Sequence, residues 1–261
     1  NKLKIQKEEL IQRLASEGIK AEEGKFAPDA LNLKKPIKLR KLMAHQQGLF
    51  QVQDGAAQIV SLMLDSKPGE DILDCCAAPG GKSCYYSEIM ENKGVIVAID
   101  KSKDKMAMLE ENKTRMGAKI IKPLISDLFN LPFDENKKFD RIALDAPCSA
   151  LGVLRRHPDA RWRKKRSDIE SLANTQIKMA NCVLKFLKPG GVFVYSVCTL
   201  TSEETTRVVE GIVKQHPELK LDNIEKILPL SCKPLLEGPS ILMSYLHRHG
   251  IDGFFAVRFV K

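Results

Sequence analysis

The sequence lacks several features that would assign it quickly to a special class of protein. It has no apolar run long enough to cross a bilayer, and its first ten residues mix charged with apolar side chains, unlike a signal peptide. It contains no internal repeat and no low-complexity tract. These absences argue against a membrane protein, a secreted precursor and a repeat protein. They leave an ordinary globular domain of 261 residues, or one domain with a small appendage.

The 7 cysteines include no Cys-x-x-Cys pair, and their number is odd. A zinc ribbon or zinc finger therefore has little support, and no metal site is predicted. A secreted disulfide scaffold would be unusual in a chain of this length. We expect a cytoplasmic protein whose cysteines are free thiols. Since the chain begins with Asn rather than Met, we expect a fragment or a processed product. We also expect a monomer.

Acidic residues are too few to balance the basic ones, and the formal net charge is +9. Such an excess favours an anionic partner, of which nucleic acid is the commonest, although an ordinary basic surface is the alternative. The first part of the chain differs from the rest in its composition and its pattern of apolar residues. Residues 7–18 are spaced for a short amphipathic helix, and residues 19–42, with Pro28, Pro36 and many lysines, indicate short strands and loops. We therefore separate a small N-terminal α+β module, residues 1–47, from a domain of residues 48–261.

The larger domain alternates predicted strands with predicted helices. The strands are expected at residues 71–74, 95–99, 119–125, 139–144 and 192–197. The helices are expected at residues 54–64, after the turn at 77–81, and at 103–116, 168–187 and 203–214, with Lys188-Pro-Gly-Gly191 closing the long one. This order predicts an α/β fold with a parallel sheet covered on both faces. Ligands of such sheets bind beyond the carboxyl ends of the strands.

Six residues that could bind a ligand or take part in catalysis fall at or just after predicted strand ends: Asp74, Asp100, Asp127, Asp145, Cys148 and Cys198. Aspartates often cap a helix that follows a strand, which would explain one or two of the four. Helix capping does not explain cysteines in matching places. We therefore expect these side chains to meet at one edge of the sheet.

A glycine-rich turn, Ala77-Ala-Pro-Gly-Gly81, separates the first predicted strand of the sheet from a helix. Gly80 and Gly81 let the backbone approach a ligand, to which a helix N-terminus offers N–H groups. The turn is not a P-loop, because Cys76 stands where that motif requires glycine. Asp100 is placed for ribose hydroxyls, and Asp127 for an adenine amino group. A ribose, an adenine and a methionine tail together describe S-adenosylmethionine.

Several stretches resemble the Nop/Sun (NSUN) family of RNA cytosine-5 methyltransferases, and within it the bacterial Sun/Fmu group that modifies 16S ribosomal RNA. The paired motifs are Asp145-Ala-Pro-Cys148 and Val197-Cys-Thr199. The other matching stretches are residues 48–54, 74–83, 145–152, 155–159, 188–201 and 249–255. The resemblance implies a Rossmann-like class I S-adenosylmethionine-dependent methyltransferase fold with a mostly parallel seven-stranded sheet. The N-terminal module resembles, more weakly, a small RNA-binding module.

The resemblance also implies roles for individual residues. Cys198 would attack carbon 6 of the cytosine, Asp145 would contact its N3 edge, and Cys148 would serve the later release step. Asp100 would bind the ribose of the cofactor, Asp127 its adenine and Asp145 its methionine end. The rest of the cofactor site would be Cys76, Ala77, Ala78, Pro79, Gly80, Gly81 and Lys82. An alternative to this cofactor role is that Lys82 is an ordinary lysine at the start of a helix.

A basic run beside the second motif is predicted to contact RNA phosphates, through Arg155, Arg156, Arg161, Arg163, Lys164 and Lys165. Trp162 within this run could stack on a base, but we expect it to be packed in the core. His157 has no obvious partner and is not assigned to catalysis.

Three other functions remain open. A transfer-RNA substrate is compatible with every motif. A DNA cytosine-5 methyltransferase would use the thiol of Pro147-Cys148 as nucleophile, and the presence of Cys198 argues against it. A non-catalytic RNA-binding factor of ribosome assembly would not need both thiols and the cofactor turn.

Overall fold

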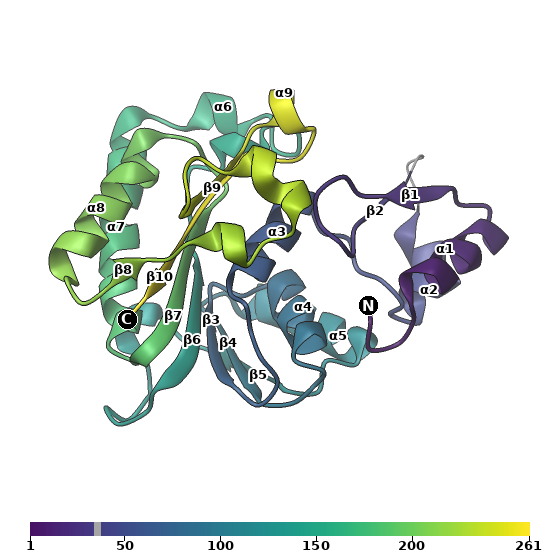
Figure 1. The fold of residues 1–261 in the computed structure, drawn as a ribbon, viewed down its shortest axis with the longest axis horizontal. Helices are drawn as coiled ribbons and strands as arrows, with labels where there is room; N and C mark the ends of the chain where they lie inside the picture. The colour runs from purple at the N-terminus through teal and green to yellow at the C-terminus, as the bar shows by residue number, and fades with distance from the viewer. Residues whose placement is uncertain (34–37) are drawn as a thin grey trace.

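The centre of this computed structural model, which describes residues 1–33 and 38–261, is an eight-stranded sheet (Figure 1). Its strand order is β5-β4-β3-β6-β7-β10-β8, and β9 also pairs with β10. The strands are β3 (Asp71–Cys75), β4 (Val95–Asp100), β5 (Ile121–Ile125), β6 (Phe139–Asp145), β7 (Leu187–Val197), β8 (Lys220–Leu221), β9 (Ile241–Ser244) and β10 (Phe254–Val260). The α/β class is as predicted. The described residues contribute eight strands rather than seven, because β8 and β9 both pair with β10.

The strands from β5 to β7 are all parallel, and β10 runs antiparallel to β7. The chain enters the sheet at β3, continues outward through β4 and β5, and returns to place β6 on the other side of β3. The carboxyl ends of β3 and β6 therefore flank the point where the winding direction changes. Open α/β sheets bind their ligands at such a point.

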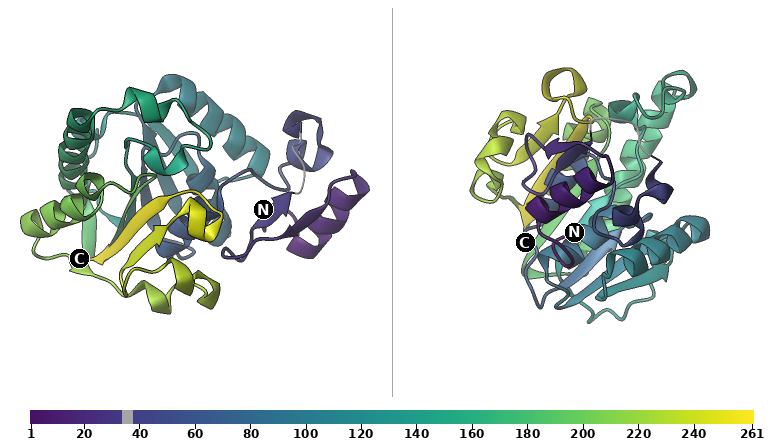
Figure 2. Two further views of the ribbon diagram at one scale, coloured as in Figure 1. Left: turned by 90° about the horizontal axis from the view of Figure 1, so that it is seen from above. Right: turned by 90° about the vertical axis from the view of Figure 1, so that its right-hand side faces the viewer.

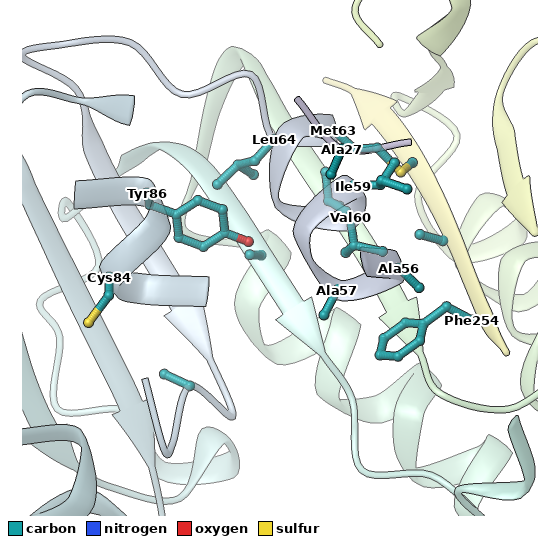
Figure 3. Close-up of a cluster of buried hydrophobic side chains, with 14 of the residues drawn as sticks. Ala27, Ala56, Ala57, Ile59, Val60, Met63, Leu64, Cys84, Tyr86 and Phe254 are labelled. Atoms are coloured by element: carbon teal, nitrogen blue, oxygen red, sulfur yellow. The ribbon is translucent and has the colours of Figure 1, made fainter. Parts of the chain in front are cut away.

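Helices cover both faces of the sheet, as the parallel arrangement requires. The helices of the larger domain are α3 (Gly55–Met63), α4 (Gly81–Ile89), α5 (Lys103–Met116), α6 (Ala160–Arg163), α7 (Arg166–Leu184), α8 (Thr206–Gln215) and α9 (Leu246–His249). The buried side chains of α3, α4 and α5 belong to one hydrophobic core, and those of α7 and α8 belong to a second. Figure 3 shows α3 in the first core, between Tyr86 of α4 and Phe254 of β10.

The predicted boundaries agree closely with the structure except around the long helix. That helix ends at Leu184, and Lys188-Pro-Gly-Gly191 lies within β7 instead of closing the helix. The pairing of β6 with β7 shifts here: Leu187 lies opposite Phe139, and Val192 opposite Arg141. The glycines thus form an irregularity in a strand. The predicted helix at residues 203–214 starts at Thr206, after a 3-10 turn from Ser202 to Glu204.

The N-terminal elements form a lobe at one side of the larger domain (Figures 1 and 2). They are α1 (Lys7–Ser16), the antiparallel strands β1 (Ala21–Glu23) and β2 (Leu31–Leu33), and α2 (Met43–Gln46). Leu10, Leu14 and Ala44 form a small core of their own, whereas Phe26 and Ala27 join the core under α3. The lobe is α+β as predicted, and the boundary at residue 47 stays a prediction. Pro36 lies outside the described residues.

Two buried arginines satisfy the carbonyl groups at the C-terminal end of α3. Arg258 donates from Nη1 to the carbonyl oxygens of Met63 at 2.7 Å and Leu64 at 3.1 Å, and Arg141 donates to that of Leu64 at 2.7 Å. Arg258 also pairs with Asp222 at 2.7 Å. The last carbonyls of a helix have no partner within the helix, and cations near that end are favourable. These contacts fasten α3 to β6 and β10.

No helix in the described part of the chain has the length and apolarity needed to cross a membrane.

We expect Arg258→Met to lower the free energy of unfolding by about 1–3 kcal/mol, because it leaves buried carbonyls and Asp222 without their donor. Urea unfolding of the purified protein measures the change. Arg207→Met on the exposed side of α8 is the matched control, with an expected change within about 0.5 kcal/mol. Equal stability of the two variants would contradict this account of the α3 terminus.

Candidate active site

The two cysteines predicted at strand ends lie next to each other. Asp145, the last residue of β6, is paired with Ser196 of β7, and the amide of Ala146 donates to the carbonyl of Ser196 at 2.9 Å. Each strand then turns, and the Sγ atoms of Cys148 and Cys198 lie 3.3 Å apart. Both side chains are partly buried. The expected meeting of the two motifs is therefore confirmed by their geometry.

The environment of Cys148 disfavours the thiolate form of this residue. The hydrogen bond to Cys198, followed by burial, raises the pKa of the Cys148 thiol well above its usual range. Cys148 is thus disfavoured as a thiolate nucleophile. Burial also raises the pKa of Cys76 and Cys84 to about 12.

A buried carboxylate beneath the thiol pair joins the two loops that carry it. Glu204, fully buried, accepts hydrogen bonds from the Ser149 amide at 2.9 Å and from Gln176 Nε2 at 3.0 Å. Its other oxygen accepts from the Thr201 hydroxyl at 3.1 Å. The hydroxyls of Ser149 and Thr199, the residues that follow the two cysteines, lie 2.8 Å apart. Sequence reasoning missed Glu204 and Gln176.

The loop after Cys148 is held by a cluster of four charges. The guanidinium groups of Arg155 and Arg156 each contact both Asp54 and Asp252, at 2.6–2.9 Å. Asp54 also caps α3 by accepting from the Ala56 amide. Arg155 and Arg156 were expected to contact RNA phosphates, but their charges are already balanced by two nearly buried carboxylates. Their clearest role is to hold this loop.

Backbone contacts fix the same loop against the nucleophile. The Gly152 amide donates to the carbonyl of Cys198 at 3.0 Å, and the Gly253 amide donates to the carbonyl of Gly152 at 2.9 Å. A Cβ atom at Gly152 would lie 2.1 Å from the Gly253 oxygen, so no larger residue fits. Three segments far apart in sequence therefore pack backbone to backbone beside Cys198.

Two cavities lie beside the glycine-rich turn, and they share Cys76, Ala78 and Asp145. One, of about 200 Å³, also contains Ala77, Pro79, Gly81 and Lys82. The other, of about 300 Å³, also contains Asp100 and Asp127. Gly80 has a φ of 95°, a left-handed conformation that favours glycine, and lies against Leu109 rather than in either cavity lining. The predicted cofactor residues other than Gly80 are thus brought together around two adjoining cavities.

Lys82 points into this space and does not behave as a surface lysine. Its Nζ lies 2.5 Å from Asp145 Oδ2, and its side chain is only 13% exposed. The other oxygen of Asp145 accepts from the Ser196 hydroxyl at 2.8 Å. Asp145 is therefore fixed from both sides, between the glycine-rich turn and β7.

The lining of the larger cavity contains the kinds of group that bind a nucleoside. Asp100 accepts from the Ser102 amide and Asp127 from the Phe129 amide. The capping interpretation is correct for Asp127, which caps a 3-10 turn, but not for Asp100, because the N-cap of α5 is Ser102. Each uses one oxygen for this bond, and the second is left to accept from a hydroxyl or an amino group. The apolar lining, which suits a flat base, is formed by Ile99, Leu128, Pro147 and Met179.

Asp74 has an unusual environment at the end of β3. It is 1% exposed, its Oδ2 accepts from the Ser83 hydroxyl at 2.6 Å, and its Oδ1 has no partner among the described residues. Burial raises its pKa to about 7, against the hydrogen bond from Ser83 and the charge of Lys82, which lower it. Asp74 lines the same cavity as Lys82 and Asp145. The sequence predicted that Asp74 lies at this edge of the sheet, but no sequence feature indicated that burial would raise the pKa of its carboxyl group.

The basic run lies on the outside of the domain. Arg161, Arg163, Lys164 and Lys165 are exposed, in keeping with the prediction of a surface for phosphates. The expected core position of Trp162 is wrong, because its side chain is 82% exposed. The reason is local: α6 is a four-residue helix with no buried residue. Among the described residues, no group of three or more His, Cys, Asp or Glu side chains is arranged to hold a metal ion.

Comparison with protein families gives two matches along the chain. Residues 61–260 match the sequence model of the 16S rRNA methyltransferase RsmB/F family, and residues 1–40 match that of a ferredoxin-like domain of RsmF/B-like methyltransferases. A curated relative from Bacillus subtilis, named "Probable ribosomal RNA small subunit methyltransferase B", is 37% identical over 98% of this chain. The aligned part is 57% of that relative, so the chain spans little more than half of its length.

Solved structures show the same likeness in three dimensions. NSun6 from Pyrococcus horikoshii, solved with SFG, is 33% identical, with a TM-score of 0.76 over 89% of this chain and 59% of that one. A methyltransferase homologue from Pyrococcus horikoshii is 27% identical, with a TM-score of 0.83 over 99% of this chain and 84% of that one.

The raised pKa of Asp74 predicts a pH dependence that its amide variant lacks. A carboxyl whose pKa is higher in the folded state contributes stability that is complete below the unfolded pKa and is lost as pH rises toward the folded one. We expect the wild type to lose stability relative to Asp74→Asn between pH 3.8 and about 7, and the difference to level off above. The slope is at most about 1.4 kcal/mol per pH unit. Urea unfolding of both proteins over this range measures it, and a constant difference would refute the assignment.

Proposed function

This chain belongs to the 16S rRNA methyltransferase RsmB/F family, and from that membership we propose that it methylates carbon 5 of a cytosine in small-subunit ribosomal RNA, with S-adenosylmethionine as methyl donor. The observation that carries the proposal is the thiol pair of Cys148 and Cys198, 3.3 Å apart. It lies at the strand ends that also border the cavity lined by Asp100 and Asp127. The proposed place of action is the cytoplasm, and the proposed active form is a monomer.

The cofactor site is assigned to the residues around the two joined cavities. Asp100 would accept from the ribose hydroxyls, Asp127 from the adenine amino group, and Asp145 would face the methionine end. NSun6 was solved with SFG, an analogue of S-adenosylmethionine, which supports a site of this kind in the family. When bound, S-adenosylmethionine supplies an electrophilic methyl group. The protein must therefore make carbon 5 of the cytosine nucleophilic.

Cys198 would supply this activation by covalent catalysis. Its thiolate adds to carbon 6 of the cytosine, forming an S–C bond, and the electrons of the ring double bond become available at carbon 5. The negative charge that develops at N3 needs a proton or a hydrogen bond. Asp145 is assigned to this edge of the base, and Lys82 and Ser196 hold its carboxyl group in one orientation.

Release of the product needs two further events after the methyl group is in place. A base removes the hydrogen on carbon 5, the ring double bond re-forms, and the bond from Cys198 to carbon 6 breaks to return the thiolate. Cys148 is assigned to this step, because it lies in contact with Cys198 and holds a proton that can stabilise the departing sulfur. The base that takes the proton from carbon 5 is left unassigned.

The ribosomal substrate is preferred to transfer RNA because the RsmB/F family model and the curated relative both name ribosomal RNA. A binding factor without activity is disfavoured by the two apposed thiols, which RNA binding does not require. The target base must leave any stack before a thiol can reach its carbon 6. An unpaired or opened RNA segment is therefore the proposed form of the substrate.

We expect Cys198→Ala to abolish both methyl transfer and denaturation-resistant protein–RNA adducts. Cys148→Ala should accumulate the adduct while turnover falls by orders of magnitude, because addition proceeds and release fails. Labelled S-adenosylmethionine and total cellular RNA are mixed with each protein, and both products are quantified. Cys182→Ala, a change at a cysteine of α7 outside the site, is the matched control. Adducts that require Cys148 instead of Cys198 would reverse the assignment.

Asp100→Ala is expected to weaken cofactor binding by about ten- to a hundredfold, since it removes a charged acceptor of hydrogen bonds. Calorimetric titration with S-adenosylmethionine measures the affinity. Asp104→Ala, which removes an exposed acidic residue from the first turn of α5, should bind as the wild type does. If the two variants bind equally well, Asp100 does not hold the cofactor.

A further inference from the structure

Trp162, which was expected in the core, lies on the surface of the protein. It is the single tryptophan of the sequence and is 82% exposed on α6. Exposure alone is a weak argument, because Leu230 is 89% exposed. The position and the neighbours of Trp162 are what distinguish it.

The neighbours of Trp162 are cationic. Arg161, Arg163, Lys164 and Lys165 are all exposed, and the guanidinium of Arg161 lies 5.3 Å from the centroid of the Trp162 ring. The nearby acids are already engaged: Asp159 pairs with Arg163 at 3.5 Å, and Asp168 accepts from the Lys165 amide at 2.9 Å. An exposed aromatic ring among exposed cations is the combination that proteins use to bind single-stranded nucleic acid.

This segment also borders one of the two paired thiols, that of Cys148. A cavity of about 350 Å³ is lined on one side by Cys148, Ser149 and Ala150, and on the other by His157, Asp159, Ala160, Arg163, Lys164 and Asp168. The C-terminus, at the end of β10, lies at the lower end of the sheet in Figure 1, and α6 is drawn at the opposite end. Since β10 is antiparallel to β7, that opposite end is where the parallel strands terminate. The helix that carries Trp162 therefore lies at the end of the sheet that holds the proposed active site, and its residues Ala160 and Arg163 line the cavity next to Cys148.

We propose that Trp162 stacks on an unpaired base adjacent to the target cytosine, while Arg163 and Lys164 contact the phosphate that links the two nucleotides. The inference deepens the proposed function and depends on it for the identity of the target base. Moving a cytosine out of a stack leaves its neighbour with one face uncovered. The indole ring covers such a face and accepts any base, because every base has an aromatic face. The cavity between Cys148 and α6 would then hold the connecting backbone.

The sole tryptophan allows a direct test on the wild-type chain. We expect its fluorescence to be quenched when a short single-stranded oligoribonucleotide containing cytidine is added, with binding followed in parallel by the anisotropy of labelled RNA. Inorganic polyphosphate carries charge without bases and should compete for the cations without quenching. Equal quenching by polyphosphate would mean that α6 contacts phosphate only. Bound RNA with unchanged fluorescence would overturn the stacking directly.

Variants at the exposed position test the energetic role without disturbing the core. Trp162→Leu should weaken RNA binding and raise KM for RNA on the order of tenfold, with kcat changed much less, and Trp162→Phe should recover most of the loss. Leu230→Ala, at an equally exposed apolar site away from the strand ends, is the control and should bind as the wild type does. Unaltered RNA affinity in Trp162→Leu would refute the proposal.

The outcomes also separate this inference from the proposed function. Quenching by RNA together with absent methyl transfer would retain the stacking site and reject the reaction. Normal methyl transfer by Trp162→Leu, with unchanged KM, would retain the reaction and reject the site. A wild-type chain that binds no RNA by anisotropy would overturn both.

Discussion

Parallel pairing of β6 with β7 places Asp145 opposite Ser196, and every element of the proposed chemistry depends on that register. Cys148 lies three residues beyond one strand end and Cys198 one residue beyond the other, so the pairing brings the two sulfurs to 3.3 Å. A shift of one residue would turn the side chains of a strand to the opposite face of the sheet. It would separate the thiols and remove the Ser196 hydroxyl from Asp145. The hydrophobic cores on both faces of the sheet hold this register, because β6 and β7 contribute buried side chains to each.

Buried charges fix the loops beyond the strand ends in addition to apolar packing. Glu204 accepts from the loop after Cys148 and from the loop after Cys198, so one carboxylate fixes both. Asp54 and Asp252 do the same for the segment of Arg155 and Arg156. Buried ionic groups are tolerated only when hydrogen bonds and opposite charges compensate them. Such compensated groups favour one loop geometry over others, which suits a site that must keep two thiols in contact.

Alternation of strands and helices was sufficient to predict the α/β fold and the meeting of Cys148, Cys198 and Asp145. Periodicity fixes element order, and element order fixes the edge where parallel strands end. The same reasoning missed Glu204, since an acidic residue at a helix start reads as a cap whether it faces solvent or the interior. It also misplaced Trp162, because an aromatic residue in a basic run has no pattern that tells a packed ring from an exposed one. Both questions depend on tertiary contacts, which local sequence does not encode.

Asp145 connects the two halves of the site, and this limits what its substitution can reveal. One of its oxygens is bound by Lys82 at the start of α4, and the other by Ser196 on β7. It also lines both cavities beside the glycine-rich turn. Replacing it would release Lys82, alter the cofactor cavity and remove the group assigned to the cytosine edge, all at once. Lost activity in an Asp145 variant therefore cannot assign its role, whereas Cys198, Cys148 and Asp100 each act on one identifiable step. The separate tests of those three residues constrain what remains for Asp145.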